Sequence, residues 1–236
     1  MTSPDRTSRS RRDLWLLGAL GLVAVVLLAW LVVDRTGDTE NTVADTAPET
    51  GPVGDLSRRI DGDPLALGAV DAPVVMVAYS DYRCPFCAKF SRDTEPVLVE
   101  KYVDEGVLRI EWRDLPIFGE QSMAAARAGR AAAAQGKFWE FATAVYAASP
   151  ERGHPDLSAE ALRGFAETAG VPDLDRFAQD AAGASADQSI YADVLEANAI
   201  GVSSTPSFVV NGTPILGAQP VTVFEQVIEA AAGSAP

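Results

Sequence analysis

Two cysteines, Cys84 and Cys87, are the residues of this chain whose type and spacing best suit covalent chemistry, and the 236 residues contain no others. A C-x-x-C pair fits thiol–disulfide exchange, because the attacking group in that reaction is a thiolate and a second thiol must stand close enough to close a disulfide. The pair also has the right surroundings. Pro73–Ser80 is a continuous apolar, β-branched run that predicts a central strand buried on both faces.

Pro85, directly after the first cysteine, marks the place where a helix can begin, since proline is favoured in the first helical turn. The sequence therefore predicts Cys84 at a helix N-terminus, where free N–H groups and the helix dipole favour the thiolate. Cys87 follows one turn later on the same side. We expect Cys84 to be the exposed attacking thiol and Cys87 the shielded resolving thiol.

Two other interpretations of the cysteine pair fit less well. A zinc site needs two more good ligands, and the chain offers only one histidine, His154, in a Gly/Pro loop. An inert local disulfide is poorly placed at the start of a helix. We therefore expect no metal and no cofactor other than the redox-active disulfide Cys84–Cys87.

The remaining pattern describes one folded domain over residues 60–236. A strand is predicted at Val107–Trp112, helices over about 121–198, and a closing helix from Val221 to about Ala231. Ser207–Val210 and Pro214–Leu216 read as strands, joined by Asn-Gly, a strong hairpin signal. The order strand, helix, strand, helices, hairpin, helix predicts an α/β class, a thioredoxin-like fold with a helical insertion at about 121–198.

The N-terminal residues carry a different signal. Residues 1–13 are rich in arginine, Leu14–Val33 is an apolar run of 20 residues, and residues 34–59 are polar and acidic. A helix of that length spans about 30 Å, the thickness of the bilayer core. The predicted organisation is a cytoplasmic N-terminus, a transmembrane anchor and a flexible linker, with the catalytic domain outside the cytoplasm of a single-pass cell-membrane protein. A cleaved signal peptide and a twin-arginine export signal are the competing interpretations.

The charge balance excludes one class of partner. The chain has 19 Lys and Arg against 33 Asp and Glu, a net charge of −14. So acidic a protein repels phosphate backbones, and nucleic-acid binding is not expected.

Three segments together resemble the DsbA-type thioredoxin-fold oxidoreductases: Asp71–Phe90 (DAPVVMVAYSDYRCPFCAKF), Gln135–Phe141 (QGKFWEF) and Gly201–Gly212 (GVSSTPSFVVNG). The resemblance implies a catalytic pair Cys84 and Cys87, with Pro85 and Phe86 supporting the site between them. It also implies a cis peptide bond between Thr205 and Pro206, packed against the pair, whose backbone binds the substrate peptide by strand addition.

Two positions depart from that family pattern. Many relatives carry a buried glutamate six residues before the first cysteine, where this chain has Ala78. Phe86 also stands where the strongest oxidants of the family have a histidine. Among other candidates, Phe138, Trp139 and Phe141 are interpreted as core residues, His154 as a surface loop residue, and Asp81 either as a group that influences the thiolate or as a solvated loop acid.

The function predicted is that of a dithiol oxidase that introduces disulfides into exported proteins with free cysteines. The resemblance implies a membrane quinone-linked partner that reoxidises it. The alternatives are a reductase or isomerase that uses the same residues, and a non-catalytic binding or chaperone module.

Overall fold

The computed structural model describes residues 51–234, which fold around a five-stranded sheet with the strand order β1-β3-β2-β4-β5. The central strands β2 and β3 run parallel, and the other neighbouring strands run antiparallel. The strands are β1 (Ala66–Leu67), β2 (Val74–Ser80), β3 (Leu108–Asp114), β4 (Ser207–Val210) and β5 (Thr213–Leu216). The short edge strand β1 was not predicted, because two residues carry no periodic pattern.

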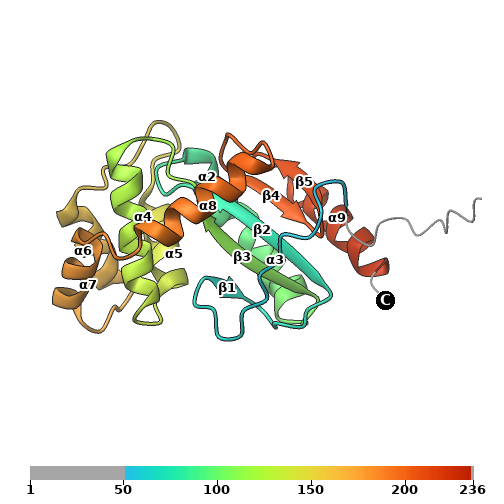
Figure 1. Cartoon of the computed structure of the whole chain (residues 1–236), viewed down its shortest axis with the longest axis horizontal. Coiled ribbons are helices and arrows are strands. Elements are labelled where there is room, and N and C mark those ends of the chain that lie inside the picture. Colours follow the sequence, from blue (N-terminus) through green and yellow to red (C-terminus); the bar gives the residue numbers. More distant parts are fainter. Residues whose placement is uncertain (1–50, 235–236) are drawn as a thin grey trace, which may run out of the picture. The chain divides into compact units, whose positions relative to one another are not determined.

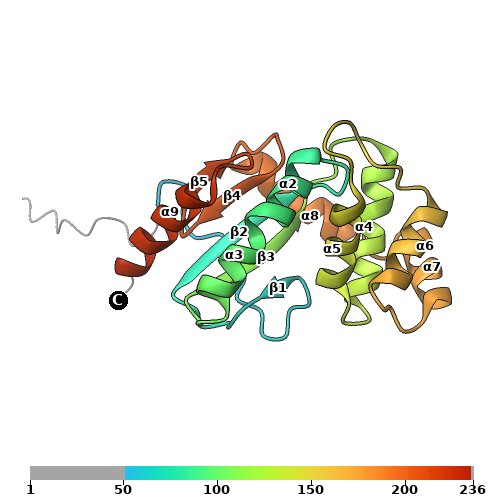
Figure 2. The same cartoon turned by 180° about the vertical axis from the view of Figure 1, so that it is seen from behind.

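Helices cover both faces of this sheet. Along β2, which is buried throughout, Val74, Met76 and Ala78 join one apolar cluster while Val75, Val77 and Tyr79 join another, as the alternation of side chains in a strand requires. The first face is covered by α2 (Pro85–Asp93), α3 (Glu95–Leu98) and α9 (Val221–Gly233), and the second by α8 (Asp187–Ala199). Figures 1 and 2 show α8 and α2–α3 on opposite sides of the sheet.

The helix that carries the cysteines is interrupted near the predicted place. The sequence predicts a helix that runs from Pro85 toward Tyr102 and is kinked at Pro96. Instead α2 ends at Asp93, α3 follows after Thr94, and a π-helical turn at Val99–Val103 completes the segment. Pro96 has no N–H to donate to the preceding turn, so the helix cannot continue through it unchanged.

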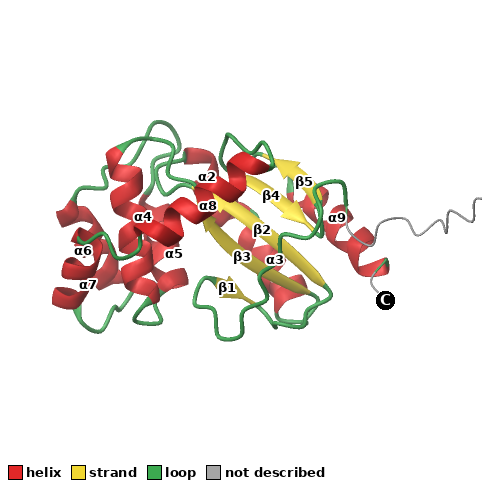
Figure 3. Cartoon of the chain, in the orientation of Figure 1, coloured by secondary structure: helices red, strands yellow, loops and turns green. Residues whose placement is uncertain are grey.

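The helical insertion forms the end of the folded domain away from α9 (Figure 3). It consists of α4 (Glu120–Ala133), α5 (Phe138–Ala148), α6 (Ala159–Thr168), α7 (Leu174–Ala182) and α8, close to the range predicted for it. Its core combines small alanines with buried aromatic rings, including those of Phe138 and Phe141. Trp139 packs against the same core, so the interpretation of these three aromatic residues as core residues is confirmed.

The folded domain begins earlier than the predicted boundary at residue 60. The N–H of Gly51 donates to the carbonyl of Asn211 at 2.7 Å, and the N–H groups of Arg58 and Arg59 each donate to the Glu111 carboxylate at 2.9 Å. Residues 51–59 are thus attached to the sheet, and the linker interpretation is wrong for them. Within residues 51–234 no helix has the length and apolar character needed to span a membrane. The predicted anchor, Leu14–Val33, lies outside the described residues.

Candidate active site

The two cysteines lie where β2 passes into α2. The strand ends at Ser80, and Cys84 is the residue that caps the helix, with extended backbone angles (φ −77°, ψ 119°) and Pro85 next in the first turn. The N–H of Cys84 donates to the Asp81 carbonyl at 3.0 Å, which closes a tight turn before the helix. The structure therefore places Cys84 at the helix N-terminus, as the sequence predicted.

The predicted exposure of Cys84 is wrong, whereas Cys87 is shielded as predicted. Cys84 is only 2% exposed and Cys87 1%, and both are free thiols. Cys84 is covered because the loop before β4 lies over it. The side chain that does reach the solvent is Phe86, which is 60% exposed between the two cysteines.

The two thiols differ in acidity instead. The pKa of Cys84 is lowered from 9.0 to about 6, chiefly by the hydrogen bond it receives from Cys87, with further help from Thr205 and from the N–H groups of Cys87 and Phe86. The pKa of Cys87 is raised well above 9.0, because full burial and the neighbouring Cys84 disfavour a second charge. At neutral pH the first thiol is ionised and the second is protonated.

A loop from the other end of the domain completes the site. The Thr205–Pro206 peptide bond is cis, the geometry that the family resemblance implies. The pairing of Tyr79 with Ser207 brings the residues before β4 beside the turn that follows β2. In this position the sulfur of Cys84 lies 3.2 Å from the carbonyl oxygen of Thr205, to which the protonated thiol donates a hydrogen bond.

The Thr205 side chain is also part of the site. Its hydroxyl oxygen is buried and has no partner of ordinary hydrogen-bond geometry among the described residues. It lies close enough to the sulfurs to lower the pKa of Cys84. The structure thus brings together all six residues predicted for the site: Cys84, Pro85, Phe86, Cys87, Thr205 and Pro206.

Asp81 is neither exposed nor solvated. It is 2% exposed and its carboxylate accepts three backbone N–H groups, from Arg83 and from the loop at Ile117 and Phe118. Burial raises its pKa. The interpretation as a solvated loop acid is therefore wrong. A carboxylate two residues before an N–H donor is a local turn signal, but its partners in the distant loop are visible only in the fold.

Aromatic side chains pack in the same apolar cluster as the two cysteines. The ring of Tyr82 stacks on Tyr146 with centroids 5.6 Å apart, and it contacts Trp112 at 5.2 Å. The position of the family's buried glutamate is also apolar, since Ala78 is 4% exposed and lies in the cluster that contains Phe90 and Phe208.

His154 lies at the rim of the site. It is exposed, as expected, and its Nδ1 is 2.8 Å from the carbonyl oxygen of Arg83. Its ring also lies against Phe118, with centroids 4.7 Å apart. Within residues 51–234 no group of three or more His, Cys, Asp or Glu side chains is arranged to hold a metal ion.

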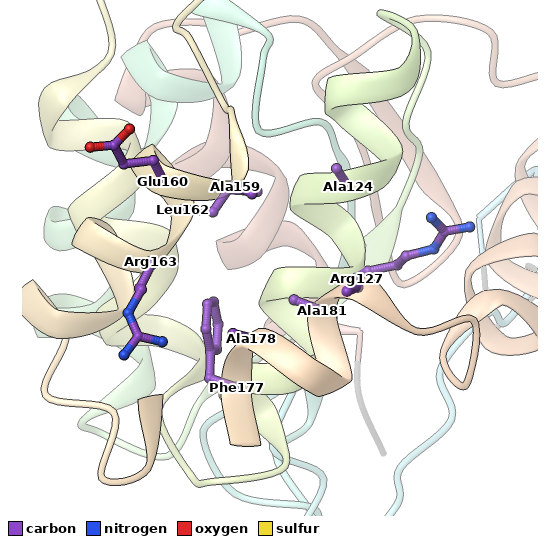
Figure 4. Close-up of a pocket in the computed structure, with 10 residues that line it drawn as sticks. Ala124, Arg127, Ala159, Glu160, Leu162, Arg163, Phe177, Ala178 and Ala181 are labelled. Carbon is purple, nitrogen blue, oxygen red and sulfur yellow. The ribbon is translucent and has the colours of Figure 1, made fainter. Parts of the chain in front are cut away.

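A hollow in the helical insertion is separate from the cysteines. Figure 4 shows it between α4, α6 and α7, with the ring of Phe177 at its centre, and its volume is about 520 Å³. Its two arginines are already engaged: Arg127 donates to Asp187, and Arg163 to the Leu174 carbonyl and Asp175. The lining therefore offers no unpaired cation to a ligand.

Comparisons with known proteins agree with this fold. The family model described as thioredoxin matches residues 61–230. The oxidised form of BdbD from Bacillus subtilis superposes with a TM-score of 0.67 at 21% identity, covering 72% of this chain and 92% of that one. The probable disulfide bond formation protein D of Bacillus anthracis is 29% identical over 150 residues, 62% of this chain and 69% of that protein. The thioredoxin-like α/β fold with a helical insertion is confirmed.

The curated relatives also include longer proteins. The Na⁺/H⁺ antiporter NhaA 3 of Salinispora tropica is 36% identical over 170 residues, 71% of this chain and 24% of that protein. The chain thus spans about a quarter of the length of such relatives. The names of these antiporter relatives contradict the predicted localisation as a single-pass membrane protein, which is withdrawn.

Proposed function

Because the chain belongs to the thioredoxin family and is an oxidoreductase of the DsbA-like kind, we propose that it is a dithiol oxidase with Cys84 and Cys87 as its catalytic pair. The observation that carries the proposal is the unequal acidity of the two thiols. A pKa of about 6 at Cys84 makes its thiolate a good leaving group, and thiols of low pKa leave mixed disulfides fastest.

The reaction begins with the Cys84–Cys87 disulfide. A substrate thiolate attacks the sulfur of Cys84, the bond to Cys87 breaks, and Cys87 takes up a proton, as its high pKa favours. A second substrate thiolate attacks the substrate sulfur of the mixed disulfide and displaces Cys84 as a thiolate. Two electrons pass from the substrate dithiol to the enzyme, and the substrate gains a disulfide.

The loop at Thr205–Pro206 is the proposed substrate-binding element. It lies at the Cys84 sulfur, directly before β4 begins. A substrate peptide lying along this backbone would bring its cysteine to Cys84. Phe86, exposed beside the pair, adds an apolar contact.

The proposed substrates are exported proteins with free cysteines, and a separate quinone-linked partner returns the enzyme to its disulfide form. Neither step needs a cofactor bound to this chain. The site residues are the same for the alternative activities, reduction or isomerisation, so the direction of electron flow decides between them.

Equilibration of the purified protein with glutathione tests the direction. An oxidase has a higher reduction potential than a reductase such as thioredoxin, so it stays in its dithiol form at glutathione ratios that leave the reductase oxidised. Each 30 mV of that difference in potential corresponds to about 1.4 kcal/mol. The variant Cys84→Ser should lose all exchange with a reduced model protein, and Cys87→Ser should accumulate mixed disulfides. A wild-type protein that catalyses no exchange would support a non-catalytic binding module, and a potential as low as that of thioredoxin would support a reductase.

A further inference from the structure

Asp81 is a buried carboxylate beside the redox pair to which the exchange reaction assigns no role. It lies on the turn between β2 and α2, three residues before Cys84, and is 2% exposed. Within residues 51–234 it forms no ion pair with Lys or Arg. A charge buried without a cation is costly, so its hydrogen bonds must compensate.

These hydrogen bonds join two separate segments. One carboxylate oxygen, Oδ1, accepts the N–H of Arg83 at 2.8 Å, within the turn that carries the first cysteine. The other oxygen, Oδ2, accepts the N–H groups of Ile117 at 2.7 Å and Phe118 at 3.2 Å, in the loop that follows β3.

The backbone of the same residue reaches the redox turn itself. The carbonyl oxygen of Asp81 accepts the N–H of Cys84 at 3.0 Å and the hydroxyl of Tyr146 at 3.2 Å. Two further bonds join the same segments: the N–H of Leu115 donates to the Ser80 carbonyl, and the Arg83 guanidinium donates to the Phe118 carbonyl at 2.7 Å.

We propose that Asp81 is a positioning residue for disulfide exchange, whose carboxylate holds the Asp81–Cys84 turn against the Leu115–Phe118 loop. This fixes the first N–H groups of α2 on the sulfur of Cys84. The inference rests on the proposed function for its meaning, but its effect on the thiol is measurable without any substrate.

The direction in which the pKa of Cys84 changes distinguishes the hydrogen bonds of Asp81 from its charge. A carboxylate close to Cys84 disfavours a second negative charge, so loss of its charge alone would lower the pKa of Cys84. Loss of its hydrogen bonds loosens the turn, and the thiolate then loses N–H groups that stabilise it. If Asp81 acts by position, the pKa of Cys84 rises.

Asp81→Asn is the informative variant, because an amide has one acceptor oxygen and cannot serve both segments. We expect the pKa of Cys84, followed by thiolate absorbance, to rise by about one unit, a tenfold change in the ionisation constant. The glutathione equilibrium should move about tenfold toward the disulfide form. Asp81→Ser, which keeps a small acceptor for Arg83 and loses both loop bonds, should shift the pKa in the same direction.

Asp173→Asn is the matched control. Asp173 also accepts two backbone N–H groups, from Asp175 and Arg176, but it caps α7 in the helical insertion. Its substitution should leave the Cys84 pKa and the glutathione equilibrium unchanged.

Two results would overturn the inference. A lowered Cys84 pKa in folded Asp81→Asn and Asp81→Ser would show that charge is what matters. Equal loss of stability in the oxidised and reduced forms, with the equilibrium unchanged, would show a purely structural role. Failure of the proposed function is a separate result, since it appears in the wild-type protein as a reductase-like potential.

Discussion

Lowering the pH should remove the stability that the reduced protein gains from Cys84. The pKa of this thiol is about 6 in the folded protein, against 9.0 for an ordinary cysteine. An acid whose pKa is depressed by folding stabilises the native state fully above its unfolded pKa, and this stabilisation is lost as the pH falls through the folded pKa. For Cys84 the loss therefore runs from about pH 9 down to about pH 6.

The size of the effect follows from these two values. At pH 8 the folded thiol is almost fully ionised while the unfolded thiol is mostly protonated. This difference in ionisation raises the folding equilibrium constant by about two powers of ten. At 1.36 kcal/mol per pKa unit this stabilises the reduced protein by about 3 kcal/mol, and at pH 5 by almost nothing. The disulfide form has no thiol to titrate, so its stability lacks this contribution.

The measurement is denaturant unfolding of both redox forms between pH 5 and pH 8. Asp81 and Glu95, whose pKa values are raised by burial, titrate in both forms, so the difference between the forms largely removes them. The free energy of unfolding of the reduced form should rise relative to that of the oxidised form as the pH rises. Reduced Cys84→Ser should not show this rise. Parallel curves, or a thiolate titration near pH 9, would refute the reasoning.

Three further outcomes are expected. Thr205→Val, which removes the buried hydroxyl beside the sulfurs, should raise the pKa of Cys84 in a thiolate titration; an unchanged pKa would leave only the Thr205 carbonyl as a contact. Ala78→Glu should raise the same pKa if the new carboxylate ionises, and a lowered value would show that residue 78 does not face the pair. Phe141→Ala empties a fully buried site that contacts Tyr82 and should cost about 3–5 kcal/mol of unfolding free energy in denaturant titrations; a loss below about 1 kcal/mol would mean that the insert collapses into the space.

The parts of the fold that the sequence predicted are those determined by residues close to one another in the sequence. The strand before the cysteines is visible because a strand buried on both faces has apolar residues at successive positions, here Val74–Tyr79, and the helix start is visible because proline fixes its first turn. The hairpin is visible from Asn211-Gly212, and both residues indeed have positive φ, 41° and 83°. Each of these signals involves residues within a few positions of one another.

Helix α8 shows why longer-range features escape such reasoning. Its apolar residues Tyr191 and Leu195 are 55% and 68% exposed, whereas Asp193 is fully buried. Asp193 pairs with Arg58 and Arg130, which come from the segment before β1 and from α4. The inward face of α8 thus places Asp193 between the buried Ile190 and Ala197, and the usual rule that apolar residues face the core does not predict that carboxylate. The cations that make it favourable lie more than sixty residues away in sequence.

The same division applies to the redox site. The position of Cys84 at a helix N-terminus is a local property, and the sequence predicted it. The burial of Cys84 depends on Thr205, which is 121 residues away and reaches the sulfur only because β4 pairs with β2 in one register. A shift of that pairing by one residue would turn the side chains of β4 to the other face and take Thr205, whose side chain helps to lower the pKa of Cys84, away from the thiol. The acidity of Cys84 is therefore set jointly by a local helix start and by the strand register, and only the helix start leaves a signal in the sequence around the cysteines.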